Sequence, residues 1–303
     1  MNTDFPGLST YLKDEARRVE AALERAVAAL EAHALDPDTL AAIRHGVMSG
    51  GKRLRPILCV SAYAACGGQR TAASYDLAAS LEMIHAYSLM HDDLPCMDDA
   101  ELRRGRPTTH RVHGEDVTMR AGAALIPAAA LQALTACNSL GCSPETGVEV
   151  TRQLLEAAGA GGMVGGQWVD LLGEGSALGA EDLNALHRMK TGALLAASLV
   201  MGATAAGADA TTRTDLETYG RAIGLAFQIA DDILDATQTA ETLGKNPSDA
   251  ELDKSTYVSL YGLDEARRRA QEQIDEALAA LTTAGIDAPA LEALARYVVE
   301  REK

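Results

Sequence analysis

The sequence has 303 residues, of which 47% are hydrophobic and 23% charged, so it has enough apolar material for one large core. Aromatic residues make up only 4% and Ala is abundant, a balance that favours helix over strand. The formal net charge of −16 argues against a nucleic-acid-binding protein, which needs a basic surface. A phosphorylated substrate is still possible, because the charge around the site decides that question.

Periodic apolar stripes predict helices along most of the chain, beginning with residues 11–33, where charged residues occupy the opposite face. Similar patterns predict further helices over 72–91, 121–140, 147–171, 180–205, 216–237, 263–281 and 289–300. No segment alternates like a strand, and no linker or fixed-period repeat interrupts the series. We therefore expect a single all-α domain over residues 1–303, built as a large helical bundle.

Two stretches, 121–146 apart from Glu145 and 191–208, carry no charge and are long enough to suggest membrane spans. Both are rich in Ala, Gly, Ser and Thr, and Pro127 should break the first. Buried core helices, and no membrane span, are the expectation.

The cysteines and the N-terminus bear on the cellular compartment. Neither a CxxC pair nor a Cys/His cluster occurs, so disulfides and a zinc site are not expected, and the N-terminus has no apolar region of a signal peptide. We expect a cytoplasmic protein with reduced thiols, at Cys59, Cys66, Cys96, Cys137 and Cys142.

The strongest chemical signal is an acidic cluster that directly follows the apolar run 83–90. Its four carboxylates, with no Lys or Arg between them, are Asp92, Asp93, Asp98 and Asp99. Crowded carboxylates raise one another's pKa unless a cation neutralises them, and idle charge is unfavourable at the end of a buried element. Asp92 and Asp98 are six apart and cannot share one face of a regular helix, so Pro95 must disturb the backbone between them.

A second acidic cluster lies in another apolar segment, where Asp231, Asp232 and Asp235 follow Gln228. Asp231 and Asp235 are four apart and share a helix face. Oxygen donors without His or Cys favour Mg²⁺ held jointly by carboxylates, waters and substrate phosphates. Calcium is the alternative metal, although the spacing is not that of an EF-hand.

Basic residues gather beside both acidic clusters, which is unexpected in an acidic protein and suggests a metal–diphosphate site. The cations are Lys52, Arg53 and Arg55 after two glycines, Arg103, Arg104 and Arg106 behind the first cluster, Lys190 before Thr191, and Lys245 and Lys254 after the second cluster. His85 is equally compatible with a core histidine and with a diphosphate contact. The glycine-rich run 159–166 lacks the context of a nucleotide-binding loop, so close helix packing is its expected purpose.

Taken together, these motifs resemble the short-chain trans-prenyltransferases, and among them most closely the bacterial farnesyl diphosphate synthases. The similar segments, spread in order over about residues 40–260, are GGKRLRP, IHAYSLMHDDLPCMDDAELRRGRPTTH, GMVGGQWVDL, HRMKTGALL, FQIADDILD and LGKNPSDAELDKSTY. The resemblance implies an all-α isoprenoid synthase fold with a central cavity, usually a homodimer. It also implies Mg²⁺, three ions per active site once substrate is bound.

The resemblance further implies a role for each site residue. Asp92, Asp98 and Asp231 would ligate Mg²⁺, supported by Asp93, Asp99, Asp232 and Asp235. Isopentenyl diphosphate would bind Lys52, Arg55, His85 and Arg104; the allylic diphosphate would bind Arg103, Lys190, Lys245 and Lys254. Thr191 and Gln228 would line the space beside the developing cation, and Tyr87 would limit chain length. The chain departs from the family pattern at Ala123, Asp253 and Val258, none of which is a proposed ligand.

The expected reaction is a head-to-tail condensation of isopentenyl diphosphate with dimethylallyl and geranyl diphosphates that yields farnesyl diphosphate. Geranyl or geranylgeranyl diphosphate is the alternative product. A terpene cyclase would not need GGKRLRP or the pair Arg103–Arg104, and an inactive partner subunit would not keep both acidic clusters. An acidic Ca²⁺-binding helical protein would not explain the basic clusters.

Overall fold

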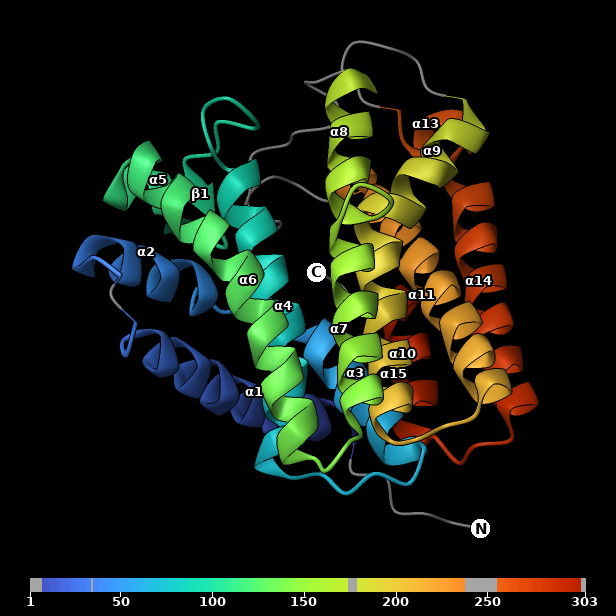
Figure 1. Cartoon of the computed structure of the whole chain (residues 1–303). Coiled ribbons are helices and arrows are strands. Elements are labelled where there is room, and N and C mark those ends of the chain that lie inside the picture. Colours follow the sequence, from blue (N-terminus) through green and yellow to red (C-terminus); the bar gives the residue numbers. More distant parts are fainter. Residues whose placement is uncertain (1–6, 34, 174–178, 238–254, 301–303) are drawn as a thin grey trace.

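The computed structural model describes residues 7–33, 35–173, 179–237 and 255–300. These residues form a helical bundle, as the sequence predicts (Figure 1). The helices are α1 (Leu8–Leu30), α2 (Pro37–Val47), α3 (Leu54–Ala65), α4 (Ala72–Asp92), α5 (Thr109–His113), α6 (Glu115–Ser139), α7 (Pro144–Ala158), α8 (Met163–Gly173), α9 (Ala180–His187), the π-helical turn η1 (Arg188–Gly192), α10 (Ala193–Ala205), α11 (Ala210–Thr237), α13 (Tyr257–Tyr261), α14 (Leu263–Ala284) and α15 (Pro289–Glu300).

Two helices, α2 and α7, begin at a capping residue that is followed by a proline. Asp36 accepts a hydrogen bond from the Thr39 amide at 3.0 Å. In the same way Ser143 caps α7 and accepts from the Thr146 amide at 3.2 Å. Both prolines, Pro37 and Pro144, occupy the first helical position, where no amide hydrogen is needed.

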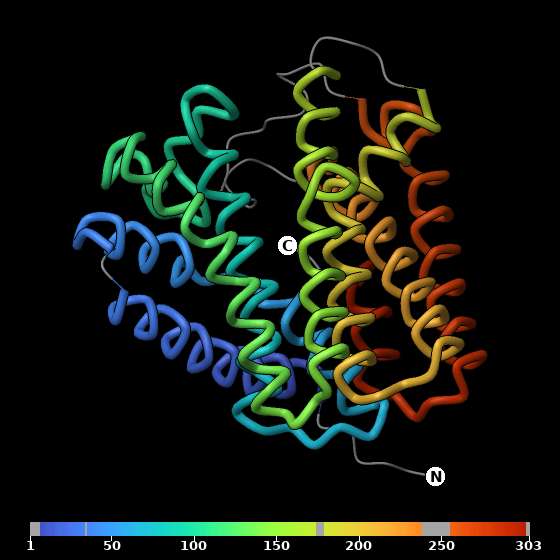
Figure 2. The backbone as a smooth tube through the Cα atoms, in the orientation of Figure 1, coloured from blue at the N-terminus to red at the C-terminus, as the bar shows by residue number. Residues whose placement is uncertain are grey.

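The main core joins the two halves of the chain. Helix α10 packs on α3 and α11, while α4 packs on α6, and Figure 2 shows how these segments, distant in sequence, run beside one another. Small residues allow the approach, since a Cβ at Gly202 would overlap the Cys59 carbonyl of α3 and one at Gly220 would lie 2.5 Å from Ala196 Cα. All five cysteines are free thiols.

Helix α6 differs from the expected element in two ways. It starts before residue 121, and Pro127 lies inside it without ending it. Pro127 and Ala123, four residues earlier, are both exposed, so water can hydrate the Ala123 carbonyl that has lost its helical donor. Only one face is buried, since Leu131 on the other is 61% exposed, whereas α10 is the buried core helix that was expected.

The length and composition of α6 would let it cross a membrane, and among the described helices it alone passes that test. Only a third of its apolar window is buried, 33%. A single helix of this kind is weak evidence for a span.

Two predicted helices are divided in the structure. The segment 147–171 is interrupted between Ala158 and Met163, where glycines turn the chain from α7 into α8. The segment 180–205 forms α9 and α10 with η1 between them. Two short antiparallel strands, β1 (Leu102–Arg103) and β2 (Arg106–Pro107), form a hairpin that apolar periodicity could not predict.

Candidate active site

The first acidic cluster lies on a compact turn at the end of α4. The helix ends at Asp92, and the amide of Asp98 then donates to the Asp92 carbonyl over 2.9 Å. Asp99, whose φ is +46°, donates its amide to the Leu94 carbonyl at 3.1 Å. The turn therefore brings back together the two carboxylates whose spacing excluded a common helix face.

Electrostatics at this turn favour a bound cation. Burial raises the pKa of Asp92 to about 7, the Lys190 ammonium opposes the shift, and the neighbouring Asp98 carboxylate adds to it. Charge on Asp92 is therefore poorly compensated by the protein itself. Lys190, which lies in η1, thus acts electrostatically on the carboxyl of Asp92.

Asp93 points to a different partner from its neighbour Asp92. It is buried, and Arg103 Nε and Nη2 lie 2.7 and 2.6 Å from its Oδ1. Such a two-pronged contact fixes the plane of the guanidinium. Asp93 thus anchors Arg103 at the start of the hairpin, directly behind the acidic turn.

The hairpin also carries Arg104 to the glycine-rich loop before α3. Arg104 has a φ of +55°, and its Nη1 donates to the Gly50 carbonyl. Gly51 has a φ of +119°, and a Cβ there would overlap the Arg104 guanidinium. Glycine at position 51 is therefore favoured by its backbone conformation, and a larger residue there would also displace the Arg104 guanidinium.

Arg55 and His85 lie beside Arg104. Burial lowers the pKa of Arg55, with Arg104 adding to the decrease, and Arg55 Nε is buried without a hydrogen-bond partner in the described structure. Burial and then the Arg55 and Arg104 charges hold the pKa of His85 well below its usual range. Arg55, His85 and Arg104, called the basic pocket below, have donors that no carboxylate saturates, which suits an anionic ligand. Lys52 lies exposed beside this pocket in the chain.

Lys190 and Thr191 lie in η1, where the five-residue turn differs from the α-helix around it. Lys190 Nζ is 2.5 Å from Asp170 Oδ2 on α8. A Cβ at Gly166 would overlap the Lys190 backbone, so this glycine lets α8 pack directly on η1. Close helix packing, expected for the glycine-rich run, is thereby confirmed at one of its residues.

The second acidic cluster ends α11. A Cβ at Gly224 would lie 2.9 Å from Gly192 Cα, so α11 packs tightly on η1 one to two turns before Gln228 and Asp231. Asp231, Asp235 and Gln228 are half-buried.

Asp232 behaves differently from the other acids of this cluster. It is buried and accepts the Tyr257 amide at 2.6 Å, at the first residue of α13. The side chain of His187 lies 4.0 Å away, and burial lowers the pKa of that imidazole to about 4. Lys245, Lys254 and the departure Asp253 lie outside the described residues, whereas Ala123 is exposed and Val258 packs on a small core beside α14.

The carboxylates suit a hard metal ion chemically. Within the described ranges, no three His, Cys, Asp or Glu side chains come close enough to hold an ion by themselves. Mg²⁺ commonly takes one or two carboxylates and completes its shell with water and phosphate oxygens. The donor set therefore fits a metal that binds together with a diphosphate.

Two residues of this region were not singled out from the sequence, Asp170 and Glu82. Asp170 lies in the segment GMVGGQWVDL and pairs with Lys190. Glu82 is a lone acid directly before the apolar run 83–90, and its Oε1 lies 2.7 Å from Arg53 Nη1. In the sequence, the signal that could have identified Glu82 is an isolated charge within a predicted apolar helix, where a buried charge needs a partner.

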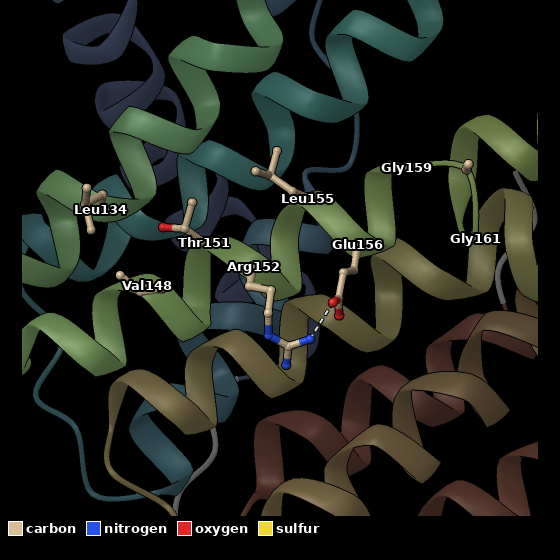
Figure 3. Close-up of a pocket in the computed structure, with 9 residues that line it drawn as sticks. Leu134, Val148, Thr151, Arg152, Leu155, Glu156, Gly159 and Gly161 are labelled. Atoms are coloured by element: carbon tan, nitrogen blue, oxygen red, sulfur yellow. Dashed lines mark hydrogen bonds and ion pairs between the residues drawn. The ribbon is translucent and has the colours of Figure 1, made fainter.

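A separate groove of about 750 Å³ lies between α6 and α7 (Figure 3). Apolar side chains line it, among them Leu134, Val148 and Leu155, and Arg152 pairs with Glu156 at 2.5 Å on its rim. It holds no acidic cluster, so it is a surface feature distinct from the site above.

Comparison with known proteins agrees with the site. The sequence model of the polyprenyl synthetase family matches residues 37–292. Farnesyl diphosphate synthase of Escherichia coli (strain K12) is 41% identical over 305 residues, covering 99% of this chain and all (100%) of that protein. The chloroplastic geranylgeranyl pyrophosphate synthase of Catharanthus roseus is 43% identical, covering 88% of this chain and 75% of that protein.

A solved structure shows the same fold. The geranyltransferase of Helicobacter pylori, crystallised with magnesium and isoprenyl diphosphate, superposes with a TM-score of 0.78 at 32% identity, covering 99% of this chain and 98% of that one. The fold, the acidic and basic motifs and these likenesses lead to one conclusion: the chain belongs to the polyprenyl synthetase family and is a prenyltransferase.

Proposed function

We propose that the enzyme condenses isopentenyl diphosphate with dimethylallyl and then geranyl diphosphate, in a Mg²⁺-dependent head-to-tail reaction that gives farnesyl diphosphate. One observation carries the proposal. The contact between Arg103 and Asp93 joins the acidic turn to the hairpin, and the charge of Arg103 acts both on Asp92 and on His85, which the Arg55 charge also affects. Two diphosphates, one bound through metal and one through arginines, fit such a pair of subsites.

The residues divide the work between these subsites. Arg103 and Lys190, with Lys245 and Lys254, hold the allylic diphosphate, while Lys52, Arg55, His85 and Arg104 hold isopentenyl diphosphate. Mg²⁺ bound at Asp92, Asp98 and Asp231 would neutralise charge that builds on the departing diphosphate as the C–O bond breaks. Three ions per substrate-bound site remain the expected number.

Once the allylic cation forms, the isopentenyl double bond attacks it and the product loses a proton. The released diphosphate is the proposed acceptor of that proton. Thr191 and Gln228, both half-buried, face the developing positive charge in this proposal, and the apolar helix walls keep water from quenching it.

The observed contacts refine the roles of two carboxylates. Asp93 is engaged by Arg103 and Asp232 by the Tyr257 amide, so we assign both to positioning rather than to the metal. Asp99 lies 3.6 Å from Arg111 Nη2, and Asp99 and Asp235 are proposed to support the metal-bound diphosphate.

Product length is proposed to be C15, with C20 and C10 as alternatives. Tyr87 lies five residues before Asp92 and packs edge-on against His91, with ring centroids 4.8 Å apart. A chain anchored at the acidic turn and growing along α4 would meet this ring. Relatives named for C15 and for C20 products are about equally similar.

We also propose a homodimer, with the groove between α6 and α7 covered by a second copy. Val148 in the groove and Leu131 on α6 are 63% and 61% exposed, and a second copy over this face would remove their apolar surface from water. Five free thiols fit a reducing, cytoplasmic setting.

Incubation of the purified enzyme with dimethylallyl and isopentenyl diphosphates and Mg²⁺, followed by chromatography of the dephosphorylated products, tests the proposal. Farnesol should dominate. Geranylgeraniol or geraniol as the end product would correct the chain length, and a hydrocarbon released from an allylic diphosphate alone would favour a cyclase. Absence of any prenyl product would refute the condensation.

A further inference from the structure

The loop that presents Lys52 and Arg55 has an unusual backbone. Gly50 and Gly51 have φ values of +81° and +119°, and Arg53, which has a Cβ, follows with +52°. An L-residue seldom adopts this conformation without compensation. Something must therefore hold Arg53 in place at the start of α3.

The side chain of Arg53 supplies that restraint from inside the protein. Its Nη1 lies 2.7 Å from Glu82 Oε1 on α4, and its Nη2 donates to the Val47 carbonyl at 3.0 Å, at the end of α2. Both side chains are almost fully buried, with 2% and 4% of their surface exposed. Arg53 Nε also lies 4.0 Å from Glu20 Oε1 on α1. One guanidinium at the start of α3 thus joins α1, α2 and α4 around the loop.

Neither member of this pair is placed to bind a substrate, since both are buried. They differ in this from Lys52 and Arg55, which flank Arg53 in the chain and are exposed and half-buried. Glu82 nevertheless acts on the pocket: its carboxylate opposes the lowering of the pKa of Arg55 and of Arg104 that burial causes. The acid therefore lies among the cations of the pocket while its bond goes to Arg53.

We infer that Glu82 and Arg53 are a positioning pair for the isopentenyl diphosphate subsite. Held by Glu82, Arg53 keeps the loop in its left-handed turn, which fixes Lys52 and Arg55 on either side of it and leaves the Gly50 carbonyl facing Arg104. This inference rests on the proposed function, because it assigns the pocket to one of the two substrates.

Removing one partner leaves a buried charge uncompensated, so single variants alone cannot separate positioning from folding. The double variant Arg53→Met/Glu82→Met removes both charges and keeps apolar volume. Such replacements of buried ion pairs are often neutral or favourable for stability. Glu82→Gln, which keeps the shape and one acceptor, is the second variant should the double variant fail to fold.

The experiment compares KM for isopentenyl diphosphate, KM for geranyl diphosphate and Tm in the full-length enzyme. In the double variant we expect a Tm close to that of the wild type, a KM for isopentenyl diphosphate raised about tenfold, equivalent to about 1.4 kcal/mol, and an unchanged KM for geranyl diphosphate. Glu82→Gln should shift the same constant in the same direction by less. The matched control is Arg25→Met/Asp76→Met, which removes another ion pair to α4 (2.6 Å) and should change neither KM.

Two results would overturn the inference. One is a folded double variant, or a folded Glu82→Gln, with a wild-type KM for isopentenyl diphosphate; the other is an equal rise in both constants, which means general loosening. If the wild type forms no prenyl product, the proposed function itself fails, and this inference with it. If the wild type forms the product and the folded variant keeps the wild-type KM for isopentenyl diphosphate, only the inference is refuted and the proposed function stands.

Discussion

The basic and acidic halves of the site are stabilised in opposite ways. On the basic side the protein provides the restraints: Glu82 holds Arg53, Asp93 holds Arg103, and the Gly50 carbonyl accepts from Arg104. On the acidic side Asp92 is the exception, since burial raises the pKa of its carboxyl to about 7 although Lys190 opposes the shift. The arginines are thus held in place by protein groups, whereas the charge of Asp92 is the one that a metal cation would compensate.

The largest expected effect comes from removing that cation. Excess EDTA should reduce incorporation of isopentenyl diphosphate to the level of a blank, because Asp92, Asp98 and Asp231 repel a diphosphate without metal. Added Mg²⁺ should restore activity. The assay is incorporation of labelled isopentenyl diphosphate into solvent-extractable product after mild acid treatment. Full turnover in excess chelator would show that the acidic half does not need a metal ion, and would contradict the contrast drawn above.

Single substitutions in each half should have different kinetic signatures. Asp231→Ala should lower kcat, and Arg55→Ala should mainly raise KM for isopentenyl diphosphate, each costing about 3 kcal/mol, or roughly two decades. Glu217→Ala, about 21 Å from Asp231 along α11 at 1.5 Å per residue, is the control and should behave as wild type. Unchanged isopentenyl diphosphate kinetics in Arg55→Ala would contradict the assignment of the pocket.

Replacing Tyr87 tests where the product grows. Tyr87→Ala should shift the products to C20 or longer, read by chromatography of the released alcohols. Since Tyr87 is half-buried, the loss of stability should be about 2 kcal/mol, below the value for a fully buried ring. Ser88→Ala is the neighbouring control and should still yield C15. A folded Tyr87→Ala enzyme that stops at C15 would place the limit elsewhere.

The smallest effect should come from the opposite end of α11. Buried Tyr219 donates its hydroxyl to the Leu291 carbonyl of α15 at 2.7 Å. Tyr219→Phe should lower the free energy of unfolding by about 1 kcal/mol, measured by urea denaturation, with activity unchanged. A loss of activity without a loss of stability would mean that the hydrogen bond of Tyr219 affects the acidic cluster at the other end of α11.

Most of the fold can be predicted from the sequence, because a helix that packs on one side has apolar residues at a helical period. The prediction fails where tertiary packing or local geometry overrides the pattern. Pro127 does not end α6, because its surroundings are solvated. The segment 180–205 contains a π turn, at which α8 and α11 both pack on the backbone through glycines. The hairpin Leu102–Pro107 has too few residues to show alternation.

The clustering of acidic and basic residues could likewise be predicted, since charges next to apolar runs are visible in the chain. What could not be predicted is which acid meets which base. Asp92 and Asp93 are adjacent and identical, yet Asp93 is paired with Arg103 while Asp92 faces Asp98 and Lys190. That difference depends on the direction of each side chain as α4 ends, which spacing alone does not fix.

The π turn η1 has a consequence for how the chain can change in evolution. A π turn contains one residue more than the α-helical turn that it replaces, and η1 lies between α9 and α10 without a break. Deleting a single residue there would convert the π turn into an α-helical turn, and α9 and α10 would keep their relative orientation because the extra residue is taken up within the turn. The buried side of α10 would therefore stay on the core. The change would fall on the side chains of the turn itself, among them Lys190, which pairs with Asp170.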